Sequence, residues 1–277
     1  MPLQYLRVNS IEDLLGHIND PNARVICGGT DLVVKMRRGI IAPARLLDIS
    51  EVGELREIRR QDGEVVIGAA ATEAELLSSE IVTAELPLLK EVLSRLGSVQ
   101  IRNRGTLGGN LVNASPAADG AIPLILYDAT VIAHSANGER EVPIEGFLRG
   151  PGQTALAEGE FLSAIKVPIP SREFHHFFHK VGRRKALTIA IASLGALARI
   201  IDGVVYEVRL AAGSVAPTPI RLHRVEELLS GNKIDKSLIA AARRLTLQTV
   251  APIDDIRASA EYRRQVIADL LVEWLKG

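Results

Sequence analysis

The chain has 277 residues, of which 47% are hydrophobic and 24% charged, a composition typical of folded proteins and unlike that of disordered chains or coiled coils. Its 33 basic residues balance its 33 acidic ones, so no net charge gathers nucleic acid or an anionic membrane. The single cysteine, Cys27, excludes an internal disulfide, and this chain alone lacks the ligands for an iron–sulfur cluster or a structural zinc site.

The N-terminal sequence predicts neither a secretory leader nor a membrane anchor. Residues 1–10 lack the basic and apolar regions of a signal peptide, and no apolar run reaches the roughly 20 residues that span a bilayer. We therefore expect a cytoplasmic protein without a membrane span.

Short strands and helices are expected to alternate in the first part of the chain. Ser10 and Asp13 have the spacing of a helix capping box, and so do Thr72 and Glu75. The first box opens a helix over residues 11–18, and Gly39 ends a second helix over residues 32–38. Apolar runs predict strands over residues 23–27, 45–50 and 65–71.

The middle of the chain contains a segment of a different kind. Residues 97–119 combine glycine, asparagine, serine and proline in an apolar context without a helical or strand period, which predicts an ordered loop. A helix and a strand follow over residues 122–135, the pair Asn137 and Gly138 predicts a hairpin turn, and residues 160–170 close this section on paired prolines.

The last third predicts an antiparallel sheet followed by helices. Residues 174–180 are strand-like, and Asp202 and Gly203 join two long apolar runs into a hairpin. Helical apolar spacing then recurs over residues 224–231, 237–250 and 260–275. The prolines around residues 168–171 indicate a domain boundary.

Two glycine-rich segments, CGGTD at residues 27–31 and TLGGN at residues 106–110, suit the binding of an anion. Glycine lets backbone amides approach a ligand closely, and successive amides in such a turn form a concave site that fits a pyrophosphate. Neither segment matches the Rossmann fingerprint or the P-loop. The carboxylate of Asp31 would repel phosphate, so we expect it to cap the following helix instead.

The order of five motifs resembles that of the FAD-binding medium subunits of molybdenum hydroxylases, such as the carbon monoxide, aldehyde, nicotine and xanthine dehydrogenases. These motifs are CGGTDL, IRNRGTLGGNLVNASPAAD, GEFLSAIKVP, HKVGRRKALTIAIASLGA and IRASAEYRR. The likeness runs from about residue 5 to residue 274, and the long second motif is its most specific part. It implies an α+β protein with a two-part FAD-binding domain of the vanillyl-alcohol-oxidase (PCMH) type, over residues 1–56 and 57–170, and a CO dehydrogenase flavoprotein C-terminal-like α/β domain over residues 171–277.

The resemblance also implies a function. The chain would be the electron-transferring subunit of an oxidoreductase, with one non-covalent FAD that takes electrons from [2Fe–2S] clusters of a small subunit and passes them to an external acceptor. Molybdopterin would reside in a large subunit, and the complex would be a dimer of heterotrimers. Such a chain would oxidise no substrate by itself, which agrees with its single cysteine and with the lack of a recognisable catalytic triad.

Matched by position, the resemblance assigns FAD contacts to both glycine segments and to later residues. The glycine segments would wrap the pyrophosphate and ribitol, Leu96 and Gly97 would pack on the flavin ring, and Asp119 would hydrogen-bond the nucleotide from a turn that Ser115 and Pro116 shape. Leu162 and Lys180 would contact the adenine side and the ring side. The implied contacts are Val25, Ile26, Cys27, Gly28, Gly29, Thr30, Asp31, Leu32, Leu96, Gly97, Thr106, Leu107, Gly108, Gly109, Asn110, Asp119, Leu162 and Lys180.

Three other groups of side chains receive plainer interpretations. His175, His176 and His179 lie in a strand-like segment without a nearby carboxylate, so no metal site is expected. The cluster Arg183, Arg184 and Lys185 forms either a solvated edge or a contact to the FAD phosphates. Cys27 is expected to pack as a small hydrophobic residue.

Two alternative functions remain open at this point. One is a self-contained FAD-dependent reductase or oxidase of the same FAD fold, similar to the enolpyruvyl-glucosamine reductases. The other is an interaction subunit that has lost FAD. The C-terminal motif IRASAEYRR disfavours the first alternative, and the intact glycines together with Asp119 disfavour the second.

Overall fold

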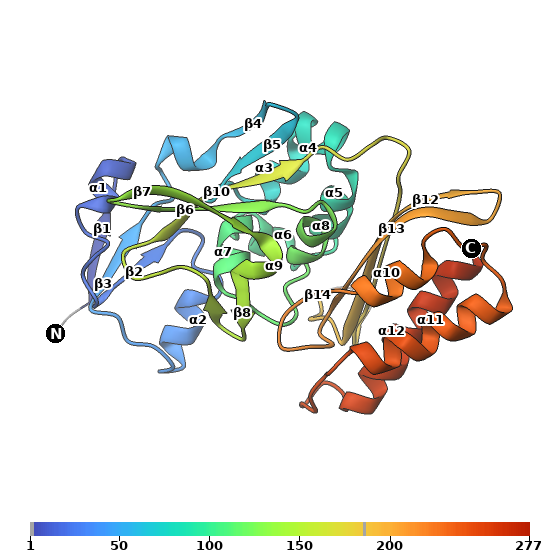
Figure 1. Ribbon diagram of the computed structural model, residues 1–277. Coiled ribbons are helices and arrows are strands. Elements are labelled where there is room, and N and C mark those ends of the chain that lie inside the picture. The colour runs from blue at the N-terminus through green and yellow to red at the C-terminus, as the bar shows by residue number, and fades with distance from the viewer. Residues whose placement is uncertain (1–2, 185–186) are drawn as a thin grey trace.

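The computed structural model describes residues 3–184 and 187–277, which form three larger β-sheets, one two-stranded sheet and the helices that pack on them (Figure 1). The N-terminal half of the chain lies on the left of Figure 1 and the C-terminal helices on the right. Among the described residues, no helix is long and apolar enough to cross a bilayer.

The N-terminal sheet is parallel, because helical crossovers join its strands. Its strand order is β1-β3-β2, and Leu14, Leu47 and Leu55 are buried in the core beside it. The elements are β1 (Gln4–Arg7), α1 (Ile11–Leu15), β2 (Ala23–Ile26), α2 (Leu32–Arg37), β3 (Arg45–Asp48) and the 3-10 turn η1 (Gly53–Arg56).

The central sheet is antiparallel, with the order β4-β5-β10-β6-β7. Its strands are β4 (Ile58–Gln61), β5 (Glu64–Gly68), β6 (Thr130–Ser135), β7 (Gly138–Pro143) and β10 (Phe161–Pro168). Val65, Ile67 and Ile165 join the largest core cluster together with the helices that follow β5. These helices are α3 (Glu73–Ser78), α4 (Glu80–Glu85), α5 (Pro87–Ser94), α6 (Val99–Arg102), α7 (Leu107–Val112) and α8 (Ala121–Leu126), and α9 (Ile144–Phe147), β8 (Leu148–Gly150) and β9 (Gln153–Thr154) follow β7.

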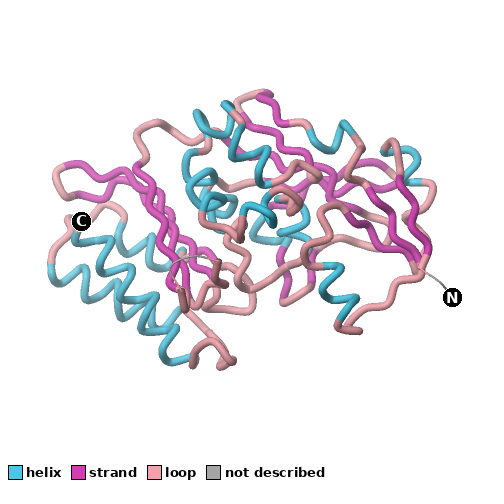
Figure 2. Tube along the Cα trace, turned by 180° about the vertical axis from the view of Figure 1, so that it is seen from behind, coloured by secondary structure: helices cyan, strands magenta, loops and turns pink. Residues whose placement is uncertain are grey.

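The C-terminal sheet has the order β11-β12-β13-β14 and carries helices on its outer face, as the view from behind shows (Figure 2). Its opposite side packs on α8 of the central part. The strands are β11 (His175–Val181), β12 (Ala192–Ile201), β13 (Val204–Gly213) and β14 (Ile220–Arg221), and the helices are α10 (His223–Leu229), α11 (Lys236–Thr249) and α12 (Ala260–Lys276).

A buried arginine ties α12 to this sheet. Arg263 is 2% exposed and donates to the carbonyls of Ile191 (2.8 Å) and Ser214 (3.2 Å), and to Oδ1 of Asp255 (2.6 Å). Burial acts to raise the pKa of Asp255, but hydrogen bonds from Arg257 and Arg263 outweigh it and lower that pKa below its ordinary value. Through Arg263, the IRASAEYRR motif therefore joins the loop before α12 to the residues that flank β12 and β13.

The structure confirms several of the predicted elements and corrects others. The hairpin at Asp202 is confirmed, since Ile201 pairs with Val204, and Thr72 does form a capping box. The loop expected over residues 97–119 is wrong in part, because α6 and α7 lie within it. Both helices are too short to show a period, and side-chain caps begin them. The first helix also ends at Leu15, before the predicted end at residue 18.

The Arg263 contacts predict a large stability difference between neighbouring arginines. Arg263→Met leaves two buried carbonyls without a donor and removes one of the donors to Asp255, so we expect the free energy of unfolding to fall by about 2–4 kcal/mol. The matched control is Arg264→Met, because the Arg264 side chain is one-third exposed and pairs only with Glu261 among the described residues. Urea denaturation of both variants measures the difference, and equal losses would contradict the structural role of Arg263.

Candidate functional site

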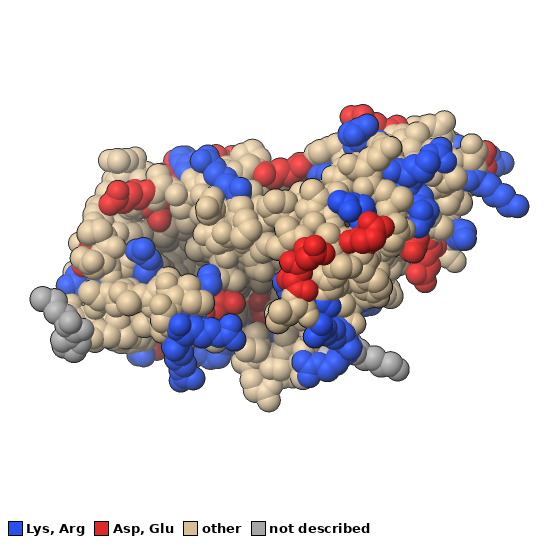
Figure 3. Space-filling model, turned by 90° about the horizontal axis from the view of Figure 1, so that it is seen from below, with Lys and Arg blue, Asp and Glu red and all other residues tan. Residues whose placement is uncertain are grey.

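Three adjoining hollows form one cleft along the side where the N-terminal sheet meets the helices of the central sheet. Their volumes are about 510, 370 and 460 Å³, and we call them the first, middle and third hollow. Cys27 and Gly109 line both the first and the middle hollow, whereas Leu96 and Asn110 line both the middle and the third. The space-filling view from below is hollowed in the half that carries the N-terminus (Figure 3).

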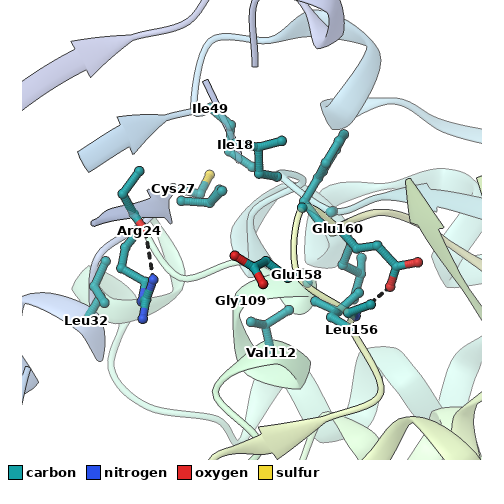
Figure 4. Close-up of a pocket in the computed structure, with 18 of the residues that line it drawn as sticks. Ile18, Arg24, Cys27, Leu32, Ile49, Gly109, Val112, Leu156, Glu158 and Glu160 are labelled. Atoms are coloured by element: carbon teal, nitrogen blue, oxygen red, sulfur yellow. Dashed lines mark hydrogen bonds between the residues drawn. The ribbon is translucent and has the colours of Figure 1, made fainter. Parts of the chain in front are cut away.

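The first hollow is mainly apolar, with three acidic residues in its lining, of which Asp20 is paired with Arg45 (Figure 4). Ile18 and Leu156 supply part of its walls, and Glu158 points into the space between them. Glu160 turns aside, where its carboxylate accepts a hydrogen bond from the Ala157 amide at 2.6 Å. An apolar slot with one free carboxylate suits a flat ring system that carries hydroxyl or amino donors.

The middle hollow contains unused backbone donors. The turn between β2 and α2 carries the amides of Gly28, Gly29, Thr30 and Asp31, none of which donates a hydrogen bond within the described part of the chain. Such a row of free amides forms a concave site for an anion. The second glycine segment lines the same hollow, where Thr106 caps α7 by accepting from the Gly109 amide at 2.9 Å.

Two of the glycines are required by the protein backbone itself. A Cβ on Gly28 would lie 1.8 Å from the Arg104 carbonyl oxygen, and one on Gly108 would lie 2.5 Å from the Ala69 carbonyl oxygen. Gly109 differs, because it is exposed and a Cβ there would meet only the Thr106 hydroxyl, at 2.9 Å. The resemblance implied that all three glycines serve the ligand, but the backbone contacts already exclude a larger residue at Gly28 and Gly108, and only Gly109 is free of such a contact.

An ion pair is buried in the wall of the third hollow. Lys180 on β11 approaches Asp119, in the turn before α8, at 2.8 Å, and their side chains are 9% and 7% exposed. The Lys180 ammonium also donates to the Arg95 carbonyl at 2.9 Å. Burial raises the pKa of Asp119 although Lys180 acts in the opposite direction, and Asp119 Oδ1 has no partner among the described residues.

The structure brings the predicted contact residues together, with one exception. All of them except Leu107 line one of the three hollows, and the Leu107 side chain is fully buried in the core. The predicted capping role of Asp31 is wrong, since its side chain makes no cap hydrogen bond. Its backbone already has helical angles, so its carboxylate stays exposed and lines the cleft.

Several residues that line the cleft were not among the contacts predicted from the sequence. Ile101 and Asn113 belong to the long central motif, so the motif itself was the signal that could have found them. Glu73 and Glu158 carry no such signal, because each is an ordinary acidic residue next to a turn. Only the folded chain brings their side chains to the cleft.

The other residues singled out in the sequence are the histidines of β11, Cys27 and the basic cluster at residues 183–185. The histidines of β11 are exposed, and the described residues include no cluster of three or more side chains suited to a metal. Burial raises the pKa of Cys27 to about 11, so the residue is a thiol at neutral pH. Arg183 donates to the carbonyls of Ile256 and Arg257, which gives it a structural role, whereas Lys185 lies outside the described residues.

Two family models match successive parts of the chain. The model of the FAD binding domain in molybdopterin dehydrogenase matches residues 1–170, and that of the CO dehydrogenase flavoprotein C-terminal domain matches residues 177–276.

Whole-length relatives agree with both models. The xanthine dehydrogenase FAD-binding subunit of Escherichia coli O157:H7 is 35% identical over 266 residues, covering 95% of this chain and 91% of the relative. The carbon monoxide dehydrogenase medium chain of Hydrogenophaga pseudoflava is 33% identical over 258 residues, covering 93% and 89%. Among solved structures, carbon monoxide dehydrogenase from Hydrogenophaga pseudoflava superposes with a TM-score of 0.93 at 32% identity, covering 99% of this chain and 96% of the other. Quinoline 2-oxidoreductase from Pseudomonas putida 86 gives 0.94 at 29% identity, covering 100% and 96%.

The glycine geometry predicts unequal stability effects at adjacent positions. Gly108→Ala forces α7 away from the end of β5, so we expect a loss of about 1–3 kcal/mol in the free energy of unfolding. Gly109→Ala displaces only a hydroxyl and gains helix propensity, so its change should stay within about 1 kcal/mol. Denaturant unfolding of the two variants checks this. If Gly108→Ala is as stable as the starting protein, the close contact with Ala69 is not rigid.

Proposed function

Because this chain belongs to the family of FAD-binding subunits of molybdopterin dehydrogenases, we propose that the cleft holds one FAD through which the chain passes electrons from the [2Fe–2S] clusters of a small subunit to an external acceptor. The observation that carries this assignment is the row of free amides of residues 28–31, placed midway along a continuous three-part cleft. A dinucleotide has the same order of parts as the cleft, with a pyrophosphate in the middle and a ring system at each end.

The residues of the cleft fit FAD along its whole length. The amides of residues 28–31 would hold the pyrophosphate, with Gly109 leaving room beside it. The apolar first hollow, including Leu162, would take the adenosine, and Glu158 would accept from its ribose hydroxyls. Asn110 Oδ1 is buried without a partner in the described chain, as is Asp119 Oδ1, so both have unused hydrogen-bonding capacity. Unpaired buried polar atoms of this kind are costly unless a ligand satisfies them.

The third hollow is proposed as the site of the flavin ring. Leu96 and Gly97 would pack against the ring, and the Asp119–Lys180 pair would place a fixed ammonium and a carboxyl beside it. Bound FAD supplies the redox chemistry, since a flavin accepts electrons singly and passes on two. The chain's own residues bind the cofactor, orient it and set the charge around it.

The partners form part of the same proposal. A small iron–sulfur subunit and a large molybdopterin subunit would complete a heterotrimer, two of which would associate in the cytoplasm. Exposed apolar side chains lie in segments that line the third hollow or adjoin it, as a docking surface for the small subunit requires: Val99, Ile101, Leu187 and Ile189. The C-terminal match over residues 177–276 favours this subunit role over a self-contained reductase.

We also propose that residues 1–56 and 57–170 are the two parts of the FAD-binding domain and that residues 171–277 form the C-terminal domain. The division is supported by the sheets, because each of the three larger ones lies within one of these ranges. The FAD cleft then lies between the first two parts, and Lys180 reaches it from the third.

The bound FAD is predicted to be non-covalent. Attachment would need a reactive thiolate or imidazole at the ring, but burial keeps Cys27 protonated, and no histidine lines any of the three hollows within the described chain. Acid precipitation of the purified protein should therefore release yellow flavin into the supernatant. Flavin that stays in the pellet after washing would show a covalent link.

Assembly is predicted to protect the segment beside the third hollow. Residues 97–104, which include α6, should exchange amide hydrogens more slowly in the complex than in the free chain, because the small subunit would cover them. Hydrogen-exchange mass spectrometry measures this, with the β12–β13 turn at Asp202 as the control, since it lines none of the hollows. Equal exchange of residues 97–104 in both states would refute the proposed route of electron entry.

A further inference from the structure

Glu73 is a buried acid at the back of the middle hollow. It is the first residue of α3, directly after the capping residue Thr72, and it is 2% exposed. Its amide donates to the Gly105 carbonyl at 2.9 Å, and its Oε2 would lie 3.2 Å from a Cβ on Gly105. Gly105, the residue before the second glycine segment, therefore packs against this carboxyl, and both residues line the middle hollow.

The Glu73 carboxyl has no hydrogen-bond partner in the described chain, and its Oε2 has no contact with solvent. Glu75, two residues further along the same helix, is the opposite case, because it accepts from the Thr72 amide at 2.7 Å and pairs with Arg56. A buried polar group without a partner costs folding free energy, so its presence in the wall of a ligand cleft points to a partner that arrives with the ligand.

The surroundings leave Glu73 balanced between its two protonation states. Burial raises its pKa to about 7, Arg102 on α6 acts to lower it, and Asp31 acts to raise it. Lys35 and Arg24 also line the middle hollow, but Lys35 is held by Asn113 at 2.6 Å and Arg24 donates to the Ala23 carbonyl at 2.8 Å. Lys35 and Arg24 are therefore already engaged by other groups, and burial raises the pKa of Glu73 by more than Arg102 lowers it.

We propose that Glu73 binds FAD in its protonated form, donating a hydrogen bond to the part of the cofactor in the middle hollow, so that FAD binding takes up a proton from solvent. The inference rests on the proposed function, because it assumes that the free amides of residues 28–31 hold the pyrophosphate in the same hollow. An ionised Glu73 would repel that dianion, whereas the neutral acid offers it a donor.

The sign of the pH dependence follows from this linkage. A neighbouring pyrophosphate raises the pKa of Glu73 above its value of about 7 in the free chain, so the complex holds more protons than the free protein. Affinity for FAD is then highest below pH 7 and falls as the pH rises through the pKa of the free chain. We expect the Kd for FAD to rise about tenfold between about pH 6 and about pH 8.

The test is a fluorescence titration of the deflavinated full-length chain with FAD across this pH range, in the starting protein and in Glu73→Gln. Glutamine keeps the size and an N–H donor but cannot ionise, so the variant should bind FAD with a Kd that changes less than about twofold over the range. Glu80→Gln is the matched control, because Glu80 is also the first residue of its helix but is exposed, and it should keep the pH dependence of the starting protein.

Calorimetry in buffers of different ionisation enthalpy gives a second readout. Near pH 7, FAD binding should take up a fraction of a proton in the starting protein and in Glu80→Gln, and none in Glu73→Gln. Asp119 is the other buried carboxyl of the cleft, but it is present in every variant and is paired with Lys180, so it cannot produce this difference.

The outcomes separate the two proposals. FAD binding that shows the same pH dependence in Glu73→Gln as in the starting protein, or none in either, overturns the role of Glu73 and leaves the FAD site intact. Failure of the starting protein to bind FAD at any pH overturns the proposed function and this inference with it.

Discussion

The cleft depends on the contact between the backbone of Gly28 and that of Arg104. With a Cβ only 1.8 Å from the Arg104 carbonyl oxygen, no other residue fits at position 28 without displacing the chain. This contact locks the first glycine turn, which belongs to the N-terminal sheet, onto the segment that leads into the second. Both turns thereby face the same hollow, and the free amides of residues 28–31 are fixed in place before any ligand arrives.

The two buried acids of the cleft, Asp119 in the third hollow and Glu73 in the middle one, have different surroundings. Asp119 is partnered by Lys180, so a charge pair is built into the wall of the third hollow. Glu73 has no partner, and its pKa lies near neutrality. The first arrangement fixes a charge distribution beside the proposed flavin ring, and the second leaves a group whose charge can adapt to the phosphates. A protein interior tolerates an acid either when the acid is protonated or when its charge is paired.

Local sequence signals explain which parts of the fold could be predicted. The hairpin at Asp202 and the capping box at Thr72 depend on residues a few positions apart, so the sequence contains all that determines them. The helices α6 and α7 have only four and six residues, and their stability comes from caps and packing rather than from a period. The predicted cap at Asp31 failed for a related reason, because the turn already gives that residue a helical backbone. Glu73 could not be identified at all, since it packs against Gly105, which lies more than 30 residues away in the chain.

The most direct test of the FAD site is a crystal structure of the purified chain, or of its complex, with the cofactor bound. We expect the pyrophosphate within hydrogen-bonding distance of the amides of residues 28–31, the adenosine in the first hollow and the flavin ring beside Asp119 and Lys180. A pyrophosphate bound elsewhere, with those amides still unpaired, would contradict the assignment of the cleft.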